Sequence, residues 1–407
     1  MNQDLYDVII IGGGPAGLSA GIYASRARLK TGLIERGRTG GQAATTEEME
    51  NYPGFPETTG PNLMDRFAEH AKHFGTEFIR DEVVALESHP EFKLIRGKKG
   101  EYRSKTVIIA VGAEPRTLGV KGEGQFRGKG VSYCATCDAD FYTDLDVVII
   151  GNGDAAIEEA LYLTKFVNKA TIIVVHDEGI LDATKIIQER AFANPKIEFV
   201  WNSVLEEIRG DGIVEEVVIK NIKNGELTTL ECNGVFIFVG TVPKTGFCQG
   251  VVEMDQRGYI RASDLMETSV DGIYVVGDCR QKYLRQVVTA AADGAIAAVA
   301  AEKYLHEEEG FREQVLDQKV PVLVNFWNVT HEDSMAMIGI VEDVAAGYGD
   351  RAKVVKIDTY KNQRVARRYN VTQVPTLLCF VGGQVVETIQ GKVEASVIKQ
   401  ALDKVVK

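Results

Sequence analysis

Short apolar runs alternate with helical stretches along most of the chain. The first run, residues 6–11, leads into a glycine-rich turn and a helix of small residues over about 15–30. The same order returns at residues 146–150, which lead into a second glycine-rich turn and a helical stretch that ends at about residue 165. Buried strands that alternate with helices predict an α/β fold with mainly parallel sheets, and the repeat predicts two Rossmann-like dinucleotide-binding domains.

A further domain is expected near the C-terminal end. Residues 304–314 are strongly charged and are interpreted as a helix tail and a linker. From residue 319 a new unit begins with an apolar strand over 320–326. It has about 90 residues, which is enough for a small domain.

The composition narrows the class of partner. The 407 residues include 46 basic and 58 acidic side chains, which give a net charge of −12. This acidic balance argues against nucleic acid or an anionic membrane as the main partner. No basic segment precedes the first apolar run and the apolar runs are strand-sized, so neither a signal peptide nor a membrane span is expected. We therefore expect a cytoplasmic protein.

The first glycine-rich turn has the spacing of a dinucleotide-binding loop. In its G-x-G-x-x-G pattern, Gly12 permits a tight turn, Gly14 lets the backbone approach a pyrophosphate, and Gly17 lets the helix pack against the strand. Glu35 follows about 20 residues later at the end of the next strand, where an acid binds ribose hydroxyls. These features predict an FAD site.

A second part of that FAD site is expected at Asp278. The apolar run 272–276 ends in Gly277 and Asp278, which places a carboxylate where the ribityl chain of a flavin is bound. The alternative interpretation is an aspartate that caps the following helix.

The second glycine-rich turn predicts a nicotinamide-nucleotide site. Gly151, Gly153 and Ala156 fit a G-x-G-x-x-A pattern that opens a helix after a strand. After the next strand, residues 176–182 contain Asp177 and two further acids but no arginine. Acids repel the 2′-phosphate of NADPH, whereas one acid can accept from the 2′-hydroxyl of NADH. NADH is therefore favoured over NADPH, and a solvated acidic loop without a ligand is the alternative.

Two of the six cysteines form a Cys-x-x-Cys pair, Cys134 and Cys137. In a chain with so few cysteines, such a pair is typical of a redox-active or metal-binding site. No second pair with zinc spacing is present, so no metal site is predicted. Asp138 follows at once and is positioned to exchange a proton with a thiol. The other four cysteines are interpreted as structural.

These motifs resemble those of low-molecular-weight, bacterial-type thioredoxin reductases over about residues 5–306. The motifs that carry the resemblance are residues 12–17, 40–42, 50–54 and 134–138, with Gly277-Asp278 and Arg285-Gln286. The resemblance implies a homodimer that binds FAD and alternates between two domain orientations. It also implies that Cys137 faces the flavin, Cys134 attacks the substrate disulfide and Asp138 donates a proton. The residues that line the flavin are then Gln42, Asn51, Asp278, Arg285 and Gln286.

The resemblance also implies a division of the chain. The FAD-binding domain is split into residues 1–114 and 245–306, and the inserted residues 115–244 form the pyridine-nucleotide-type domain that carries the dithiol. A linker over 307–316 and a thioredoxin-like domain over 317–407 complete the chain.

The sequence departs from this family at the second nucleotide site. Members that use NADPH have His-Arg-Arg-x-x-x-Arg, whereas this chain has His176, Asp177, Glu178 and Asp182. The replacement leaves NADH as the favoured donor. The alternative is a ferredoxin-driven reductase in which the nucleotide pocket is vestigial.

Residues 317–407 resemble thioredoxin but lack its chemistry. The match implies a cis bond before Pro375 and places the two redox cysteines of the family at His331 and Ser334, and its buried acid at Asn325. An imidazole and a hydroxyl cannot form a disulfide. This domain is instead expected to dock a partner, to occupy or gate the Cys134 site, or to stabilise the dimer. A hydrolytic site at His331, Glu332 and Ser334 is not favoured.

Together these features predict an enzyme that passes electrons from a reduced donor through FAD and the Cys137–Cys134 pair to a protein disulfide. The expected substrate is a separate thioredoxin or a related protein. A redox adaptor that binds clients through its cysteine-free domain is the non-enzymatic alternative.

Overall fold

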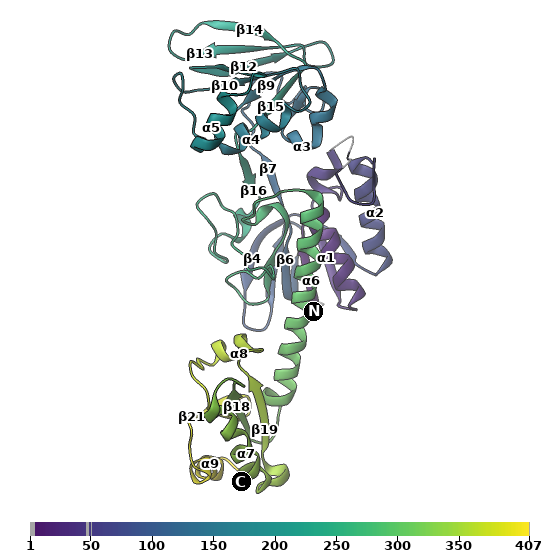
Figure 1. Cartoon of the computed structure of the whole chain (residues 1–407). Coiled ribbons are helices and arrows are strands. Elements are labelled where there is room, and N and C mark those ends of the chain that lie inside the picture. Colours follow the sequence, from purple (N-terminus) through teal and green to yellow (C-terminus); the bar gives the residue numbers. More distant parts are fainter. Residues whose placement is uncertain (1–4, 46–48, 50, 407) are drawn as a thin grey trace. The chain divides into compact units, whose positions relative to one another are not determined.

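The computed structural model describes residues 5–45, 49 and 51–406, so Glu50 of the 50–54 motif lies outside the described residues. The chain divides into two compact units, with the boundary between Ala300 and Ala301 (Figure 1). In the described residues, no helix is both long enough and apolar enough to cross a membrane.

The first unit contains a seven-stranded sheet in the order β3-β2-β1-β6-β5-β4, and β17 also pairs with β6. The neighbours β3, β2, β1, β6 and β17 are parallel, whereas β4 and β5 are antiparallel additions. The strands are β1 (Leu5–Ile11), β2 (Thr31–Glu35), β3 (Glu77–Arg80), β4 (Val83–Ser88), β5 (Lys93–Gly97), β6 (Glu101–Ile109) and β17 (Ile273–Val275). The associated helices are α1 (Pro15–Arg26), α2 (Gly60–His73) and α6 (Val287–Phe311).

A second sheet of five parallel strands lies within the same unit, in the order β11-β10-β9-β15-β8. Its strands are β8 (Val131–Ser132), β9 (Asp146–Ile150), β10 (Lys169–Ile173), β11 (Ile197–Val200) and β15 (Gly234–Ile237). An antiparallel sheet adds β12 (Ser203–Arg209), β13 (Glu216–Asn221) and β14 (Leu227–Glu231). The helices are α3 (Ala135–Asp138), α4 (Asp154–Leu163) and α5 (Lys185–Phe192). The two predicted strand–turn–helix repeats are therefore β1–α1 and β9–α4.

Two short strands, β7 (Ala113–Pro115) and β16 (Thr241–Pro243), form an antiparallel pair between these two parts of the first unit. The expected domain boundaries at 114/115 and 244/245 lie at or just after this pair. Because β17 returns to β6 after the inserted residues, the first sheet is built from two separate stretches of sequence.

The second unit has a four-stranded sheet in the order β19-β18-β20-β21. Its elements are β18 (Val322–Trp327), α7 (Glu332–Ala346), β19 (Lys353–Asp358), α8 (Gln363–Arg368), β20 (Thr376–Val381), β21 (Gln384–Gln390) and α9 (Ala395–Asp403). The predicted strand at 320–326 corresponds to β18. The bond between Val374 and Pro375 is cis, as the resemblance to thioredoxin implies.

The segment 307–316, expected to be a linker, is instead regular structure. It contains the end of α6 and the π-helical η5 (Arg312–Leu316). Phe311 and Val315 are buried in the same core as Val322 and Phe326. Phe311 lies within the charged run and Val315 just after it, so the thioredoxin-like unit includes residues that precede the expected residue 317.

Candidate active site

The first glycine-rich loop brings backbone atoms unusually close together. Gly12 has a φ of +110°, and a Cβ atom there would lie 2.4 Å from the carbonyl oxygen of Ala110. A Cβ atom on Gly17 would lie 1.9 Å from the carbonyl oxygen of Gly12. Around Gly14, by contrast, no described atom lies within 4 Å of the corresponding Cβ position. The loop is thus tight where it packs and open where a pyrophosphate would approach.

Glu35 holds this loop from the end of β2. Its carboxylate accepts hydrogen bonds from the backbone N–H groups of Gly13, at 2.8 Å, and Gly37, at 2.9 Å. The acid therefore lies beside the glycine loop, in the position that the spacing predicts for a ribose-binding carboxylate.

Asp278 lies in the short 3₁₀ helix η4 (Gly277–Cys279), between β17 and α6. Because α6 begins only at Val287, Asp278 is not its cap. Burial raises the pKa of Asp278, and the nearby charges of Lys282 and Arg285 partly oppose that shift. Its Oδ1 atom is buried and has no hydrogen-bond partner among the described residues. A buried acceptor of this kind fits a hydroxyl donor of a cofactor.

Hydrogen bonds join two predicted flavin residues to the dithiol segment. Asn51 Nδ2 donates to Gln286 Oε1 at 3.2 Å, and Gln286 Nε2 donates to Thr136 Oγ1 at 3.0 Å. Thr136 Oγ1 lies 3.5 Å from Cys134 Sγ. This chain of contacts places the cysteine pair beside residues expected to line the flavin.

The two remaining flavin candidates lie in different surroundings. Gln42 Oε1 accepts from Arg127 Nη2 at 3.0 Å, so this residue also contacts the inserted domain. The guanidinium of Arg285 lies 4.5 Å from the centre of the Tyr259 ring, and its Nε approaches the carbonyl oxygen of Asp278 at 3.5 Å.

Cys134 and Cys137 form a disulfide at the start of α3, with their Cα atoms 5.4 Å apart. Ser132 Oγ donates to Asp138 Oδ2 at 2.5 Å and accepts from the backbone N–H of Cys134 at 3.1 Å. Burial raises the pKa of Asp138, and the bond from Ser132 opposes that shift. The structure therefore brings the predicted acid close to the dithiol and favours its protonated form. The other four cysteines are buried free thiols.

Sequence reasoning missed Glu159, a carboxylate of α4 that also borders the dithiol. The backbone N–H groups of Ala135 and Thr136 donate to it, and burial raises its pKa. Its Oε2 atom is buried and without a hydrogen-bond partner in the described part of the chain. The available signal was an acid on the helix face that buries Ala156 and Ala160.

The second glycine-rich loop has the same backbone form as the first. A Cβ atom on Gly151, which has a φ of +133°, would lie 2.5 Å from the carbonyl oxygen of Phe238 and 2.9 Å from the Cβ atom of Ala156. No described atom lies within 4 Å of the Cβ position of Gly153. The loop could therefore also admit a pyrophosphate.

The acidic segment after β10 is bound to its surroundings by polar contacts. His176 Nε2 lies 3.0 Å from Asp182 Oδ2, which also accepts from Asn152 Nδ2 at 3.1 Å. Asp177 accepts from Lys223, and this contact lowers the pKa of Asp177. Lys223, in the turn between β13 and β14, was not predicted because it is distant in sequence.

The thioredoxin-like unit has no thiol at the expected positions. His331 is exposed, whereas Ser334 is buried and its Oγ accepts from the backbone N–H of Asn328 at 3.0 Å. Asn325 is completely buried, and neither polar atom of its side chain has a partner among the residues described. Nothing in this arrangement brings His331 onto the Ser334 hydroxyl.

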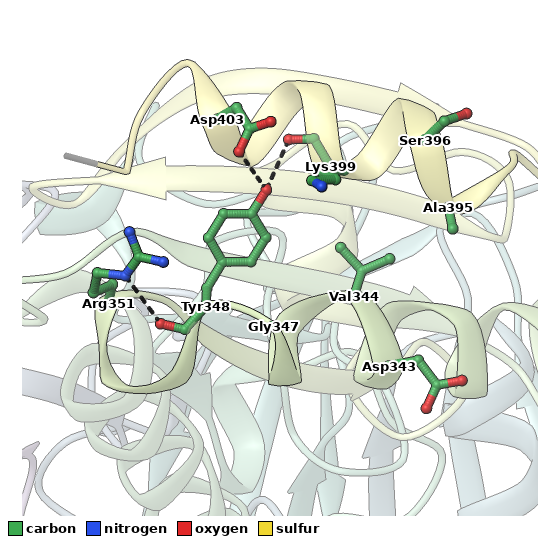
Figure 2. A pocket seen from close by; sticks show the side chains of 9 residues that line it. All are labelled: Asp343, Val344, Gly347, Tyr348, Arg351, Ala395, Ser396, Lys399 and Asp403. Carbon is green, nitrogen blue, oxygen red and sulfur yellow. Dashed lines mark hydrogen bonds between the residues drawn. The ribbon is translucent and has the colours of Figure 1, made fainter.

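This unit also contains a surface pocket of about 470 Å³ between α7, η6 (Gly349–Arg351) and α9 (Figure 2). The Tyr348 hydroxyl lies within it, but it already donates to Asp403 Oδ1 at 2.7 Å or to the carbonyl oxygen of Lys399 at 3.0 Å. None of the predicted site residues lines this pocket. Throughout the described residues, no cluster of three or more histidines, cysteines and acids could hold a metal.

Comparison with known proteins identifies the class. Residues 6–294 match the family model of pyridine nucleotide-disulphide oxidoreductases, and residues 302–404 match that of thioredoxin. The chain belongs to the pyridine nucleotide-disulphide oxidoreductase family. The fold class predicted from the sequence is confirmed.

Within that family, the chain is similar to thioredoxin reductases. It is 51% identical over 312 residues to the thioredoxin reductase of Peptoclostridium litorale. This alignment covers 75% of this chain and 98% of that protein. It is 45% identical to the enzyme of Bacillus subtilis, over 75% of this chain and 96% of that protein. The crystal structure of thioredoxin reductase from Streptococcus pyogenes matches with a TM-score of 0.71 and 44% identity, over 75% of this chain and all of that one. The chain is thus a flavoprotein disulfide oxidoreductase that resembles thioredoxin reductases.

Proposed function

We propose that this protein takes electrons from NADH and uses FAD and the Cys137–Cys134 pair to reduce the disulfide of a separate thioredoxin or related protein. The observation that carries this proposal is the hydrogen-bonded connection from Asn51 through Gln286 and Thr136 to Cys134. It joins predicted cofactor residues to a disulfide that can accept two electrons.

The residues of the first unit fit FAD. The open position at Gly14 and the N-terminal end of α1 suit a pyrophosphate, and Glu35 suits a ribose. The unpartnered Oδ1 of Asp278 suits a hydroxyl of the ribityl chain. When bound and reduced by the donor, the flavin would supply the electron pair that converts the Cys134–Cys137 disulfide into the dithiol.

The dithiol then performs thiol–disulfide exchange. The Cys134 thiolate attacks one sulfur of the substrate disulfide, which forms a mixed disulfide and releases the other substrate sulfur as a thiolate. Asp138, whose raised pKa favours the protonated form, donates the proton to the thiolate that leaves. Cys137 next attacks Cys134 Sγ, which restores the internal disulfide and releases the substrate with both of its cysteines reduced.

The charges near the second glycine-rich loop support NADH as the donor. Residues 176–182 contain three acids and no lysine or arginine, and the ion pairs found there in the described residues are Lys223 with Asp177 and His176 with Asp182. A 2′-phosphate, which carries nearly two negative charges, would be repelled by this segment. The comparisons give no support to ferredoxin.

Rapid mixing under anaerobic conditions tests the donor directly. NADH is expected to bleach the flavin absorbance at a rate about a hundredfold above that with NADPH at equal concentration. Equal rates, or bleaching only by reduced ferredoxin, would contradict the proposal.

The Cys134→Ser variant tests whether electrons reach the substrate through the cysteine pair. It should keep FAD and lose thioredoxin reduction, whereas Cys232→Ala, which alters a buried thiol of the same domain, should keep both. Full turnover of Cys134→Ser would exclude the assignment.

We also propose a homodimer, because α6 leaves an apolar stripe exposed. Val288, Ile296 and Val299 follow one face of the helix and are 36%, 39% and 53% exposed. Such a stripe favours burial against another surface. The double variant I296K/V299K should lower the mass measured by light scattering to that of one chain, whereas V84K, at an exposed valine elsewhere, should not.

A second candidate function is that of a redox adaptor. Val329 and Tyr360, which follow β18 and β19, are 64% and 74% exposed. If they bind a client, V329D/Y360D should raise the KM for the protein substrate and leave the reduction of a small aromatic disulfide unchanged. An unchanged KM would remove this candidate.

A further inference from the structure

A buried group of charges lies directly behind Asp278. Asp293 of α6 is only 4% exposed and accepts four hydrogen bonds. They come from the backbone N–H of Gly277 at 3.0 Å, from Arg280 Nε at 2.8 Å and Nη2 at 3.0 Å, and from Lys282 Nζ at 2.7 Å. None of these charges has a part in the proposed mechanism.

The position of Asp293 along α6 is firmly fixed. The next residue, Gly294, would place a Cβ atom 2.1 Å from the carbonyl oxygen of Ala16, and Ser19 Oγ donates to the carbonyl oxygen of Ala291 at 2.7 Å. The first half of α6 and helix α1 therefore lie side by side without a gap (Figure 1). Helix α1 is the helix that follows the first glycine-rich loop, so Asp293 is anchored to the expected pyrophosphate site.

Lys282 is a nearly buried cation and requires a negatively charged partner. Its side chain is 5% exposed, and a buried ammonium group without a partner is strongly unfavourable. Among the described residues, two carboxylates interact with it. Asp293 accepts its hydrogen bond, whereas Asp278, which also interacts electrostatically with Lys282, keeps its Oδ1 atom unpartnered among the residues described.

We propose that Asp293 is a positioning residue for FAD, which holds Lys282 and Arg280 so that the carboxylate of Asp278 stays free to accept a hydroxyl of the cofactor. The hydrogen bond that the Gly277 N–H donates to Asp293 fixes the left-handed turn, with φ at +71°, that presents Asp278. The inference rests on the proposed placement of FAD at Asp278. Without Asp293, Lys282 would turn to Asp278 and occupy its acceptor.

The test is a fluorescence titration of the full-length apoproteins with FAD. D293N should weaken FAD binding by roughly tenfold or more, and K282M should leave it within about threefold of the unaltered protein. The double variant D293N/K282M should recover most of the loss, because no lysine remains to compete for Asp278. D293E, which keeps the carboxylate, should bind FAD better than D293N.

Two results would overturn the inference. One is FAD binding by D293N as tight as that of the unaltered protein. The other is a double variant that binds FAD no better than D293N, since this would reduce Asp293 to a structural role.

Two controls keep the outcome clear. D278A separates this inference from the placement of the cofactor: if D278A loses affinity and D293N does not, only the role of Asp293 fails, whereas unchanged binding by D278A removes both. If apo-D293N does not unfold cooperatively, K282M and D293N/K282M are compared instead. Equal affinities of K282M and D293N/K282M for FAD support the inference. A double variant that binds FAD more than about tenfold more weakly than K282M overturns it.

Discussion

The two glycine-rich loops of the first unit share a backbone but differ in their charged surroundings. At both Gly12 and Gly151, a Cβ atom would collide with a carbonyl oxygen of a neighbouring segment, at 2.4 Å and 2.5 Å. In the first loop, the acid after the second strand, Glu35, binds the loop itself. In the second, Asp177 binds a distant lysine, Lys223. The comparison teaches that glycine spacing sets the backbone form that the two loops share, whereas their charged neighbours differ, and under the proposed function these neighbours would decide which nucleotide each loop accepts.

The most direct test of this difference is to substitute the first glycine of each loop in turn. G12A and G151A each force an alanine into a strained, crowded conformation, at a cost of about 3 kcal/mol, or roughly a hundredfold in binding. We expect G12A to be purified without flavin and without activity. We expect G151A to keep its flavin and to lose only turnover driven by NADH.

The measurements for this pair are the flavin absorbance per chain and thioredoxin reduction with NADH or with chemically reduced flavin. G124A is the matched control, because Gly124 has an ordinary backbone conformation and no described atom within 4 Å of its Cβ position. Loss of flavin from G151A would show that the two loops are not independent.

A smaller effect is expected when the charge of the second site is reversed. D177R/E178R supplies two cations for a 2′-phosphate and should raise the ratio of kcat/KM for NADPH over NADH by about ten- to a hundredfold. Steady-state kinetics with both nucleotides measures this ratio. E226Q, which alters an acid in the nearby exposed turn, should leave it unchanged. An unaltered ratio in D177R/E178R would mean that other residues determine the preference between NADH and NADPH.

The two sites should also differ in their response to acid. Burial raises the pKa of Asp278, whereas Lys223 lowers the pKa of Asp177. As the pH falls, Asp278 therefore takes up its proton first, and below its pKa the ionised fraction drops about tenfold for each pH unit. FAD affinity should decline at a higher pH than NADH affinity does. Titrations with FAD at several pH values measure the first decline, and the KM for NADH at the same pH values measures the second. D278N should remove most of the pH dependence of FAD affinity.

The smallest effect is expected from K223M. The Asp177–Lys223 pair is exposed, and such pairs contribute little to stability or binding. The KM for NADH should rise by less than about threefold, with no change in FAD content. A much larger change would show that Lys223 itself contacts the nucleotide.

Much of the fold could be predicted because the signals were local. The glycines at 12 and 151 are required by the backbone conformation of one turn, and the Cys134–Cys137 pair needs only four residues. Glu159, Lys223 and Asp293 were missed because each acts through a tertiary contact that no motif spacing signals. The packing of the expected linker over 307–316 could not be predicted for a related reason. Its charges were visible locally, but the burial of Phe311 and Val315 depends on strands that come later.

The pairing of β17 with β6 has a consequence for biosynthesis. The central strand β6 leaves the ribosome early, but β17, which pairs with its last residues Val107–Ile109, follows only after residues 110–272 have been made. The inserted domain has its own sheet and its own cores, so it can fold during translation while the outer domain waits with an exposed strand edge. A ribosome stalled before Ile273 should therefore carry a folded dithiol domain next to an FAD domain that proteases still cut.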